Sequence, residues 1–249
     1  MPQRASERTS LATLTKGRRK AIAPGRLATD NPDAGLSKGE RTRQRLLDSG
    51  RILLERDGYH AIRVSDVAAQ AGLSSGVFYI YFRDKDELAI ELFRTACKEA
   101  IGTIYAERAP AGDFAAVLHT LRRYIDIMLD SGGMIRAVVQ ILDQLPDARA
   151  IWLDMNSLVA RRIAVGMAHR APDDMRSDAA RIITAHAAQA MIDSMLLSIV
   201  SYDNADLRDM ARSRERLAQT LSVLWYRLLY GASPDPSEAP LALDFLPAG

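Results

Sequence analysis

The stretch DVAAQAGLSSGVFYIYFRDKDEL, residues 66 to 88, decides how the N-terminal part of the chain folds. Apolar residues on one face predict a short helix over residues 64–71, and Gly72 ends it. Glycine suits a sharp turn because it adopts backbone angles that are closed to other residues. A second short helix is expected to begin directly after the turn, with the hydroxyl of Ser74 as its cap. This layout predicts a helix-turn-helix.

The side chains of the second short helix divide between two faces. Phe78 and Phe82 are one helical turn apart, so both are expected to point inward against Leu54, Val67 and Leu88. The residues left pointing outward or forward are Ser75, Gly76, Val77, Tyr79 and Tyr81. Exposed tyrosines and valine are wasteful unless something covers them, and a DNA major groove would do so. The alternative is that the tyrosines are ordinary packing aromatics.

The rest of the chain also predicts helices. Apolar residues recur at three- and four-residue steps from Ser37 onward, and no alternating strand pattern appears. After the helix-turn-helix, helices are expected at 85–108, 113–130, 134–144, 147–170, 177–202 and 205–230. Glycine and proline separate several of them. We therefore expect an all-α fold.

Composition excludes several classes of protein. The chain has 249 residues, of which 48% are hydrophobic and 26% charged, as in a globular protein. No apolar run reaches the roughly 18 residues of a membrane span, and the N-terminus lacks the apolar core of a secretory signal. We expect a cytoplasmic protein without membrane contact. The single cysteine, Cys97, excludes an internal disulfide framework and a multi-cysteine zinc site.

Enzyme motifs are missing from the sequence. It contains no phosphate-binding GxxxxGK, no GxGxxG after a strand and no HExxH. Its four histidines are scattered without metal-ligand spacing. We expect neither catalysis nor a cofactor or metal.

Positive charge is concentrated at the N-terminus. Residues 1–45 hold eleven Lys or Arg and four Asp or Glu, although the whole chain has a net charge of only +2. Residues 1–36 show no amphipathic period and are expected to form a flexible basic arm. Its segment KGRRKAIAPGR suits a DNA minor groove, which attracts arginine. A merely solvated tail or non-specific ballast is the alternative.

The order of these residues resembles the DNA-binding signature of the TetR family of bacterial transcription regulators. The resemblance covers roughly residues 38–92. The matching positions are Gly58-Tyr59, Asp66-Val67-Ala68, Ala71-Gly72-Leu73-Ser74, Gly76, Phe78-Tyr79, Tyr81-Phe82, Asp84-Lys85 and Glu87-Leu88. Beyond that region only the helical count and the length are similar to the family.

The resemblance implies which residues meet double-stranded DNA. It implies base or groove contacts from Ser75, Gly76 and Val77. Phosphate contacts are implied for Tyr79, Tyr81 and Lys85, and Thr42 would also reach the backbone. Arg63 departs from the family pattern, which usually has threonine there as the cap of the first short helix. Arginine can bind phosphate directly but supplies no side-chain acceptor for that cap.

The remaining helical residues are expected to hold two copies together and to sense a small molecule. Small and apolar residues at four-three spacing form two seams, which fit a four-helix interface between two copies. They are Ile183, Ala187, Ala190 and Ser194 in one helix, and Leu217, Leu221, Leu224 and Leu228 in the last. Core packing within one chain explains either seam alone. An apolar effector pocket is expected from Tyr105, His119, Tyr124, Met128, Trp152, Met155 and His186, although any helical core contains such residues.

These expectations give a domain plan and a function. The plan is a basic arm (1–36), a helix-turn-helix domain (37–84), a ligand-binding and dimerisation domain (85–230) and a proline-rich tail (231–249). The expected protein is a dimeric regulator, a repressor rather than an activator, that binds a palindromic operator and is released by a small, largely apolar ligand. The alternative is a helical binding or scaffold protein that does not recognise DNA sequence.

Overall fold

The structure is a computed structural model that describes residues 36–171 and 176–242. The chain divides into two units, Met1–Ser37 and Lys38–Gly249, and the helices described below all belong to the second unit. The basic arm expected at 1–36, and with it the minor-groove contact, lies outside the described residues except for Leu36.

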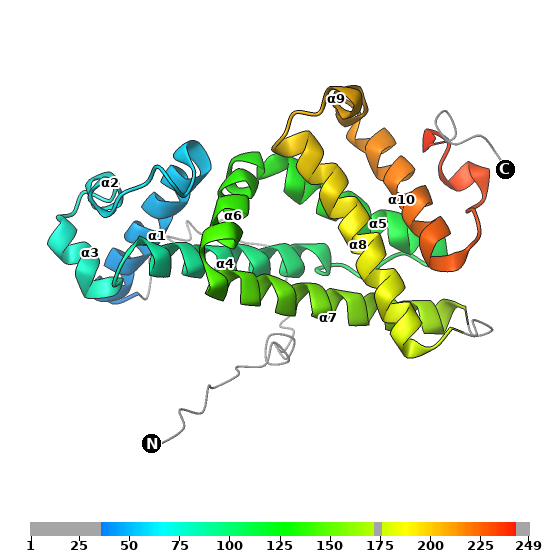
Figure 1. Ribbon diagram of the computed structural model, residues 1–249, viewed down its shortest axis with the longest axis horizontal. Helices are drawn as coiled ribbons and strands as arrows, with labels where there is room; N and C mark the ends of the chain where they lie inside the picture. Colours follow the sequence, from blue (N-terminus) through cyan, green and yellow to red (C-terminus); the bar gives the residue numbers. More distant parts are fainter. Residues whose placement is uncertain (1–35, 172–175, 243–249) are drawn as a thin grey trace, which may run out of the picture. The chain divides into compact units, whose positions relative to one another are not determined.

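The described residues fold into helices, which confirms the all-α expectation (Figure 1). The α-helices are α1 (Lys38–Asp57), α2 (Val64–Gln70), α3 (Ser75–Tyr81), α4 (Lys85–Ile104), α5 (Asp113–Asp130), α6 (Gly132–Gln144), α7 (Pro146–Arg170), α8 (Asp178–Val200), α9 (Ala205–Ala211) and α10 (Arg214–Tyr230), followed by the 3₁₀ helix η2 (Pro236–Glu238).

Two expected helices differ from the observed ones. The helix expected at 85–108 ends at Ile104. The helix expected at 205–230 is two helices, α9 and α10, because the hydroxyl of Ser213 accepts a hydrogen bond from the backbone N–H of Arg216 at 3.3 Å and so caps a new helix. Serine is a favoured N-cap residue. The boundary between α9 and α10 was not predicted because the apolar periodicity continues across Ser213.

The first hydrophobic cluster, here called the N-terminal core, joins α1–α4 to α6 and the start of α7. Phe78 of α3 is fully buried in this core, at 0% exposure, and so is Phe82, the C-cap residue of α3, at 1% exposure. They share it with Leu54, Val67 and Leu88, as expected. Arg43 of α1 forms a bidentate ion pair with Glu91 of α4 and lies 4.9 Å from the ring centroid of Phe82. These contacts fix α3 on the scaffold made by α1 and α4.

The second cluster, here called the C-terminal core, lies between α5, α8 and α10, with Met167 reaching it from α7. Helix α10 is its most enclosed element, because even its polar residues Gln219, Thr220 and Ser222 are buried. Ile125, Ile192 and Leu196 are likewise at 1% exposure or less.

Helices α1 and α6 touch backbone to backbone. A Cβ atom added to Gly133 of α6 would fall on the carbonyl oxygen of Glu55 in α1, so only glycine fits there. Next to this contact, the side-chain oxygen of Gln140 accepts a hydrogen bond from the backbone N–H of His60 at 3.2 Å. The helix-turn-helix region is therefore joined to the larger domain through α6 as well as through the continuous chain at α4.

The expected proline-rich tail is partly folded. Ala239 and Ala242 are buried against Phe114 and Val223. The backbone N–H of Leu241 donates to the side-chain oxygen of Gln219 at 2.9 Å. Residues 236–242 thus dock on α5 and α10, while the rest of the expected tail, residues 243–249, lies outside the described residues.

Candidate nucleic-acid interface and sensor core

The turn between α2 and α3 has the geometry that the sequence predicts, but not the expected cap. Gly72 has a φ of +66°, in the left-handed region that glycine tolerates best. Arg63 is the N-cap residue of α2 and makes no side-chain cap bond, as expected for arginine. Ser74 is the N-cap residue of α3, but its hydroxyl makes no cap hydrogen bond either. The expected cap by Ser74 is therefore corrected: the backbone position is right and the bond is not formed.

Helix α3 buries one face and presents the opposite face to solvent. Phe78 is completely buried, whereas Tyr79 is 59% and Ile80 is 74% exposed. At 3.6 residues per turn, Gly76 and Ile80 form the ridge opposite the buried phenylalanines. An added Cβ at Gly76 would meet only the Ser74 hydroxyl, at 3.8 Å. Nothing in the chain's own packing therefore requires glycine at this position.

The other predicted DNA contacts differ in how open they are. Ser75 and Arg63 are exposed, and Val77 is half-buried. Tyr81 is half-buried and packs on the N-terminal core, so its ring has a structural role whether or not its hydroxyl meets phosphate. The hydroxyl of Thr42 donates to the carbonyl oxygen of Lys38 at 2.9 Å, which leaves its oxygen as an acceptor.

Lys85 is held against the loop before α2. Its ammonium donates to the carbonyl oxygens of Tyr59 and Ile62 at 3.2 and 3.3 Å. The same nitrogen lies 4.6 Å from the ring centroid of Tyr59. An ammonium group has three donors, so one remains for an outside acceptor. The hydroxyl of Tyr59 donates to Asp86 at 2.6 Å, and burial together with this carboxylate raises the pKa of the phenol.

Ile80 is an exposed apolar residue of α3 that the sequence analysis did not select. The signal was available, because the analysis placed Phe78 and Phe82 inward and Ile80 lies midway between them. It was missed because an isoleucine usually indicates core packing rather than an exposed position.

The seven residues expected to line one effector pocket are not brought together. Trp152 packs on the N-terminal core, whereas Tyr124 and Met128 belong to the C-terminal core. Met155 is half-buried on α7, and His186 is exposed on α8, which corrects the expectation that it faces the interior. Apolar periodicity identified buried residues but could not tell which of two cores each one joins.

Tyr105 and His119 have separate surroundings. The guanidinium of Arg162 lies 3.9 Å from the ring centroid of Tyr105, at the end of α4. Burial raises the pKa of this tyrosine. On α5, the Nε2 atom of His119 is buried and has no hydrogen-bond partner.

A polar pair lies within the C-terminal core. The hydroxyl of Tyr124 on α5 donates to Oδ1 of Asp193 on α8 at 2.6 Å. Burial raises the pKa of Asp193, and burial followed by the nearby carboxylate raises the pKa of Tyr124. The sequence analysis missed Asp193, although an aspartate in the middle of an otherwise apolar helical segment was a visible signal.

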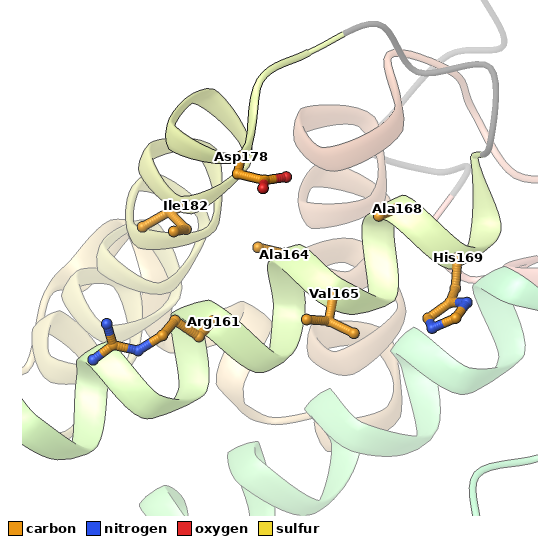
Figure 2. Close-up of a pocket in the computed structure, with 7 residues that line it drawn as sticks. All are labelled: Arg161, Ala164, Val165, Ala168, His169, Asp178 and Ile182. Carbon is orange, nitrogen blue, oxygen red and sulfur yellow. The ribbon is translucent and has the colours of Figure 1, made fainter.

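A surface groove of about 430 Å³ lies between α7 and the first turns of α8. Figure 2 shows Val165 and His169 of α7 beside Asp178 and Ile182 of α8 around it. None of the seven predicted ligand residues lines this groove.

The two predicted dimer seams differ in exposure. On α8, Ile183 is 69% exposed, and the small residues of its seam are exposed as well: Ala187, Ala190 and Ser194. On α10, Leu217 and Leu221 have 0% exposure inside the C-terminal core of their own chain. This corrects the expectation for these two residues, because a fully buried side chain has no surface for a partner. Leu224 is half-buried and Leu228 is 41% exposed.

Helix α8 leaves much apolar surface uncovered. Within the part of the chain that the structure describes, it is the one helix long and apolar enough to cross a membrane by length and composition. Only 22% of its most apolar window is buried inside the chain. Much of the apolar surface of α8 is therefore not covered by the described part of its own chain.

Comparison with known proteins gives consistent matches. The family model of "Bacterial regulatory proteins, tetR family" matches residues 46–92. The chain is 37% identical to the fatty acid metabolism regulator protein of Bacillus subtilis over 49 residues, which are 20% of this chain and a quarter (25%) of that protein. It is 25% identical to the HTH-type transcriptional regulator EthR of Mycolicibacterium smegmatis over 207 residues, covering 79% of this chain and 89% of EthR.

Solved structures share the fold. GusR of Salmonella enterica superimposes with a TM-score of 0.60 at 15% identity, and the match covers 78% of this chain and 98% of GusR. The match of higher sequence identity covers only 49 residues, and the match that covers most of the chain has only 25% identity. The similarity of fold, in contrast, extends over most of the chain.

Proposed function

We propose that this chain is a regulator of the TetR family, whose model matches residues 46–92, and that it is a dimeric repressor that leaves a palindromic operator when a small molecule binds. TetR-family proteins are transcription regulators rather than enzymes. The observation that supports DNA reading most directly is the outer face of α3, where Tyr79 and Ile80 are exposed above the buried Phe78. A rigid helix with an exposed ridge is what a major groove accepts.

The proposed DNA contacts keep the roles implied by the family and add one residue. Ile80 joins Ser75, Gly76 and Val77 in facing the bases. The phosphates are met by Tyr79, Tyr81, Thr42 and the remaining donor of Lys85. Arg63 contributes a cation at the start of α2 in place of the usual hydroxyl. Helix α3 is held by the Arg43–Glu91 pair and by the N-terminal core, so its orientation is set before DNA arrives.

A second copy of the chain is the partner that we propose for α8. Two reading heads are needed to bind a two-fold operator, spaced about one DNA turn or roughly 34–36 Å apart. The open face of α8 begins at Ile183 and continues along the small residues Ala187, Ala190 and Ser194, which allow close approach of another helix. Leu228 extends this face from the end of α10. We therefore assign the apolar face of α8 to a protein interface, and the protein to the cytoplasm where its DNA lies.

Selection of bound fragments from a random DNA pool tests the function. The full chain is expected to enrich an inverted repeat, since each half-site contacts one copy of α3. Recovery of no common sequence would remove the proposal of an operator. Recovery of a single, unrepeated half-site would remove the two-fold arrangement.

The interface is tested by placing a charge on it. Ile183→Asp is expected to convert the dimer to a monomer in sedimentation and to weaken binding to the full inverted repeat, because a buried unpaired carboxylate opposes association. Ile52→Asp is the matched control, since Ile52 is 46% exposed on α1. If both variants sediment like the parent chain, α8 is not the interface.

A further inference from the structure

Asp193 is an acid in an apolar setting without a cation. It lies near the middle of α8, and the hydrogen bond from Tyr124 is its one contact with a donor among the described residues. No Lys, Arg or His in the described ranges forms an ion pair with it. A carboxylate removed from water usually pairs with a cation or becomes neutral. Its position therefore needs an explanation.

Gln189 adds a second acceptor one helical turn earlier. Its side-chain oxygen is buried and has no hydrogen-bond partner. Residues four apart on a helix lie on the same face, with Cβ atoms about 5–6 Å apart. The face of α8 that carries Asp193 thus presents two acceptor groups, and the hydroxyl of Tyr124 is the one donor bonded to them among the described residues.

No cation of the neighbouring elements forms an ion pair with Asp193 among the described residues. Cys97 of α4 is close enough to Tyr124 to affect its titration, and burial raises the pKa of its thiol to about 12, so it stays neutral. On α5, Arg123 pairs with Glu107 through Nη2 at 2.9 Å while its Nη1 is buried without a partner, and Asp126 pairs with Arg214 at 3.4 Å.

The surroundings are otherwise apolar. The methionines of this region join the C-terminal core: Met128 of α5, with Met191 and Met195 of α8. Methionine side chains adapt to apolar ligands of irregular shape. Tyr124 and Asp193 are half-buried, so this region combines apolar neighbours with a carboxylate that is not completely enclosed.

We propose that the effector carries a protonated nitrogen on an apolar body, with its N–H groups donating to the carboxylate of Asp193 and the amide oxygen of Gln189. The apolar body lies among the methionines of α5 and α8, and Tyr124 keeps the carboxylate oriented. This inference rests on the proposed function, because it names the ligand class of a ligand-responsive regulator. It also adds a cationic end to the small, largely apolar ligand that the sequence predicts.

A matched pair of probes separates the cation from the apolar body. The full chain is titrated with 1-octylamine, which is protonated at pH 7, and with 1-octanol, in a calorimeter without DNA. A charge-assisted hydrogen bond is stronger than a neutral one, so we expect the amine to bind at least about tenfold more tightly. Both probes have the same alkyl chain, so apolar burial cancels in the ratio.

Variants assign the preference to this cluster. In Asp193→Asn the ratio of amine to alcohol affinity is expected to fall to about one, because the amide keeps the shape of the carboxylate and loses its charge. Asp206→Asn, an exposed acid of α9, is the matched control and keeps the parent ratio. Gln189→Leu is expected to lower amine affinity less than Asp193→Asn does. The Asn variant should fold, since it replaces a buried charge by a neutral group of equal size.

Three results overturn the proposal: equal affinity for amine and alcohol, an unchanged ratio in Asp193→Asn, or no binding of either probe. Release from DNA is measured in a separate experiment, which uses the inverted repeat recovered from the random pool. An amine that binds through Asp193 but leaves the DNA complex intact supports the ligand class and removes the release step. Failure to recover any repeat removes the operator and leaves the calorimetric result unchanged.

Discussion

The rings of Phe78 and Tyr79, adjacent residues of α3, lie nearly perpendicular, with centroids 5.7 Å apart and an interplanar angle of 83°. Phe78 is completely buried and Tyr79 is 59% exposed. One turn of helix therefore assigns two neighbouring aromatic residues to different tasks. Phe78 holds α3 on the N-terminal core, and Tyr79 is available to a partner.

Removal of the buried ring is expected to cost stability. Phe78→Ala should lower the free energy of unfolding by about 3–5 kcal/mol, because the lost contacts and the remaining cavity both count. Urea denaturation followed by circular dichroism measures this. A change of less than about 0.5 kcal/mol, the size of an ordinary surface effect, would contradict the burial of Phe78.

Removal of the exposed ring is expected to cost affinity instead. Tyr79→Ala should weaken binding to the selected DNA by about 1–3 kcal/mol and leave the unfolding midpoint close to that of the parent. A gel-shift titration measures the affinity. Unchanged affinity would show that Tyr79 does not contact DNA, whatever its exposure.

Gly76 separates the demands of the fold from those of binding. Glycine inside a helix costs roughly 0.5–1 kcal/mol relative to alanine, and the space beside Gly76 is open. Gly76→Ala is therefore expected to raise stability by about that amount and to weaken DNA binding, because the added methyl group keeps the helix away from the groove. If the variant binds as tightly as the parent, the DNA does not approach α3 closely at this point.

Ile80 is expected to contact a thymine methyl group. Replacing thymine by deoxyuridine at single positions of the selected DNA removes one methyl group, and burial of one such carbon contributes about 0.8 kcal/mol. One position in each half-site should show a loss of this size in the parent chain. The same substitution should have no effect in Ile80→Ala, and a loss that persists in this variant would assign the methyl contact to another residue.

The stability of the chain is expected to depend on pH through Asp193. Burial raises the pKa of this carboxyl above its ordinary value of 3.8, so the folded chain holds the proton to higher pH than the unfolded chain does. The contribution of Asp193 to stability therefore falls as pH rises from 3.8 through the raised pKa. Asp193→Asn lacks this term, so its stability relative to the parent should increase with pH across the same range. Denaturation curves at several pH values measure the difference, and parallel pH profiles would contradict the shift.

The helix-turn-helix could be predicted almost completely from the sequence. Its residues satisfy local and global requirements together: Gly72 needs a positive φ, and Phe78 and Phe82 share one buried face. When the local sequence pattern and the packing agree in this way, the structure of a segment can be predicted from its sequence.

The larger domain could be predicted as helices but not as a packing arrangement. The periodicity of α10 places Leu217, Leu221 and Leu228 on one face, and it does not show that α5 and α8 cover the first two and leave the third open. The partner of Asp193 was equally hidden, because Tyr124 is 69 residues away in the sequence. Periodicity reports which face is apolar and carries no information about which element covers it.

The contact between Gly133 and Glu55 fixes how motion can pass through the molecule. A joint made of side chains can absorb a small displacement by changing rotamers, whereas two main chains in direct contact have no such slack. Any slide of α6 caused by events in the C-terminal core must push on the end of α1, and α1 carries α3 with it. The absence of a methyl group at residue 133 thus sets how tightly the orientation of α3 is coupled to the position of α6.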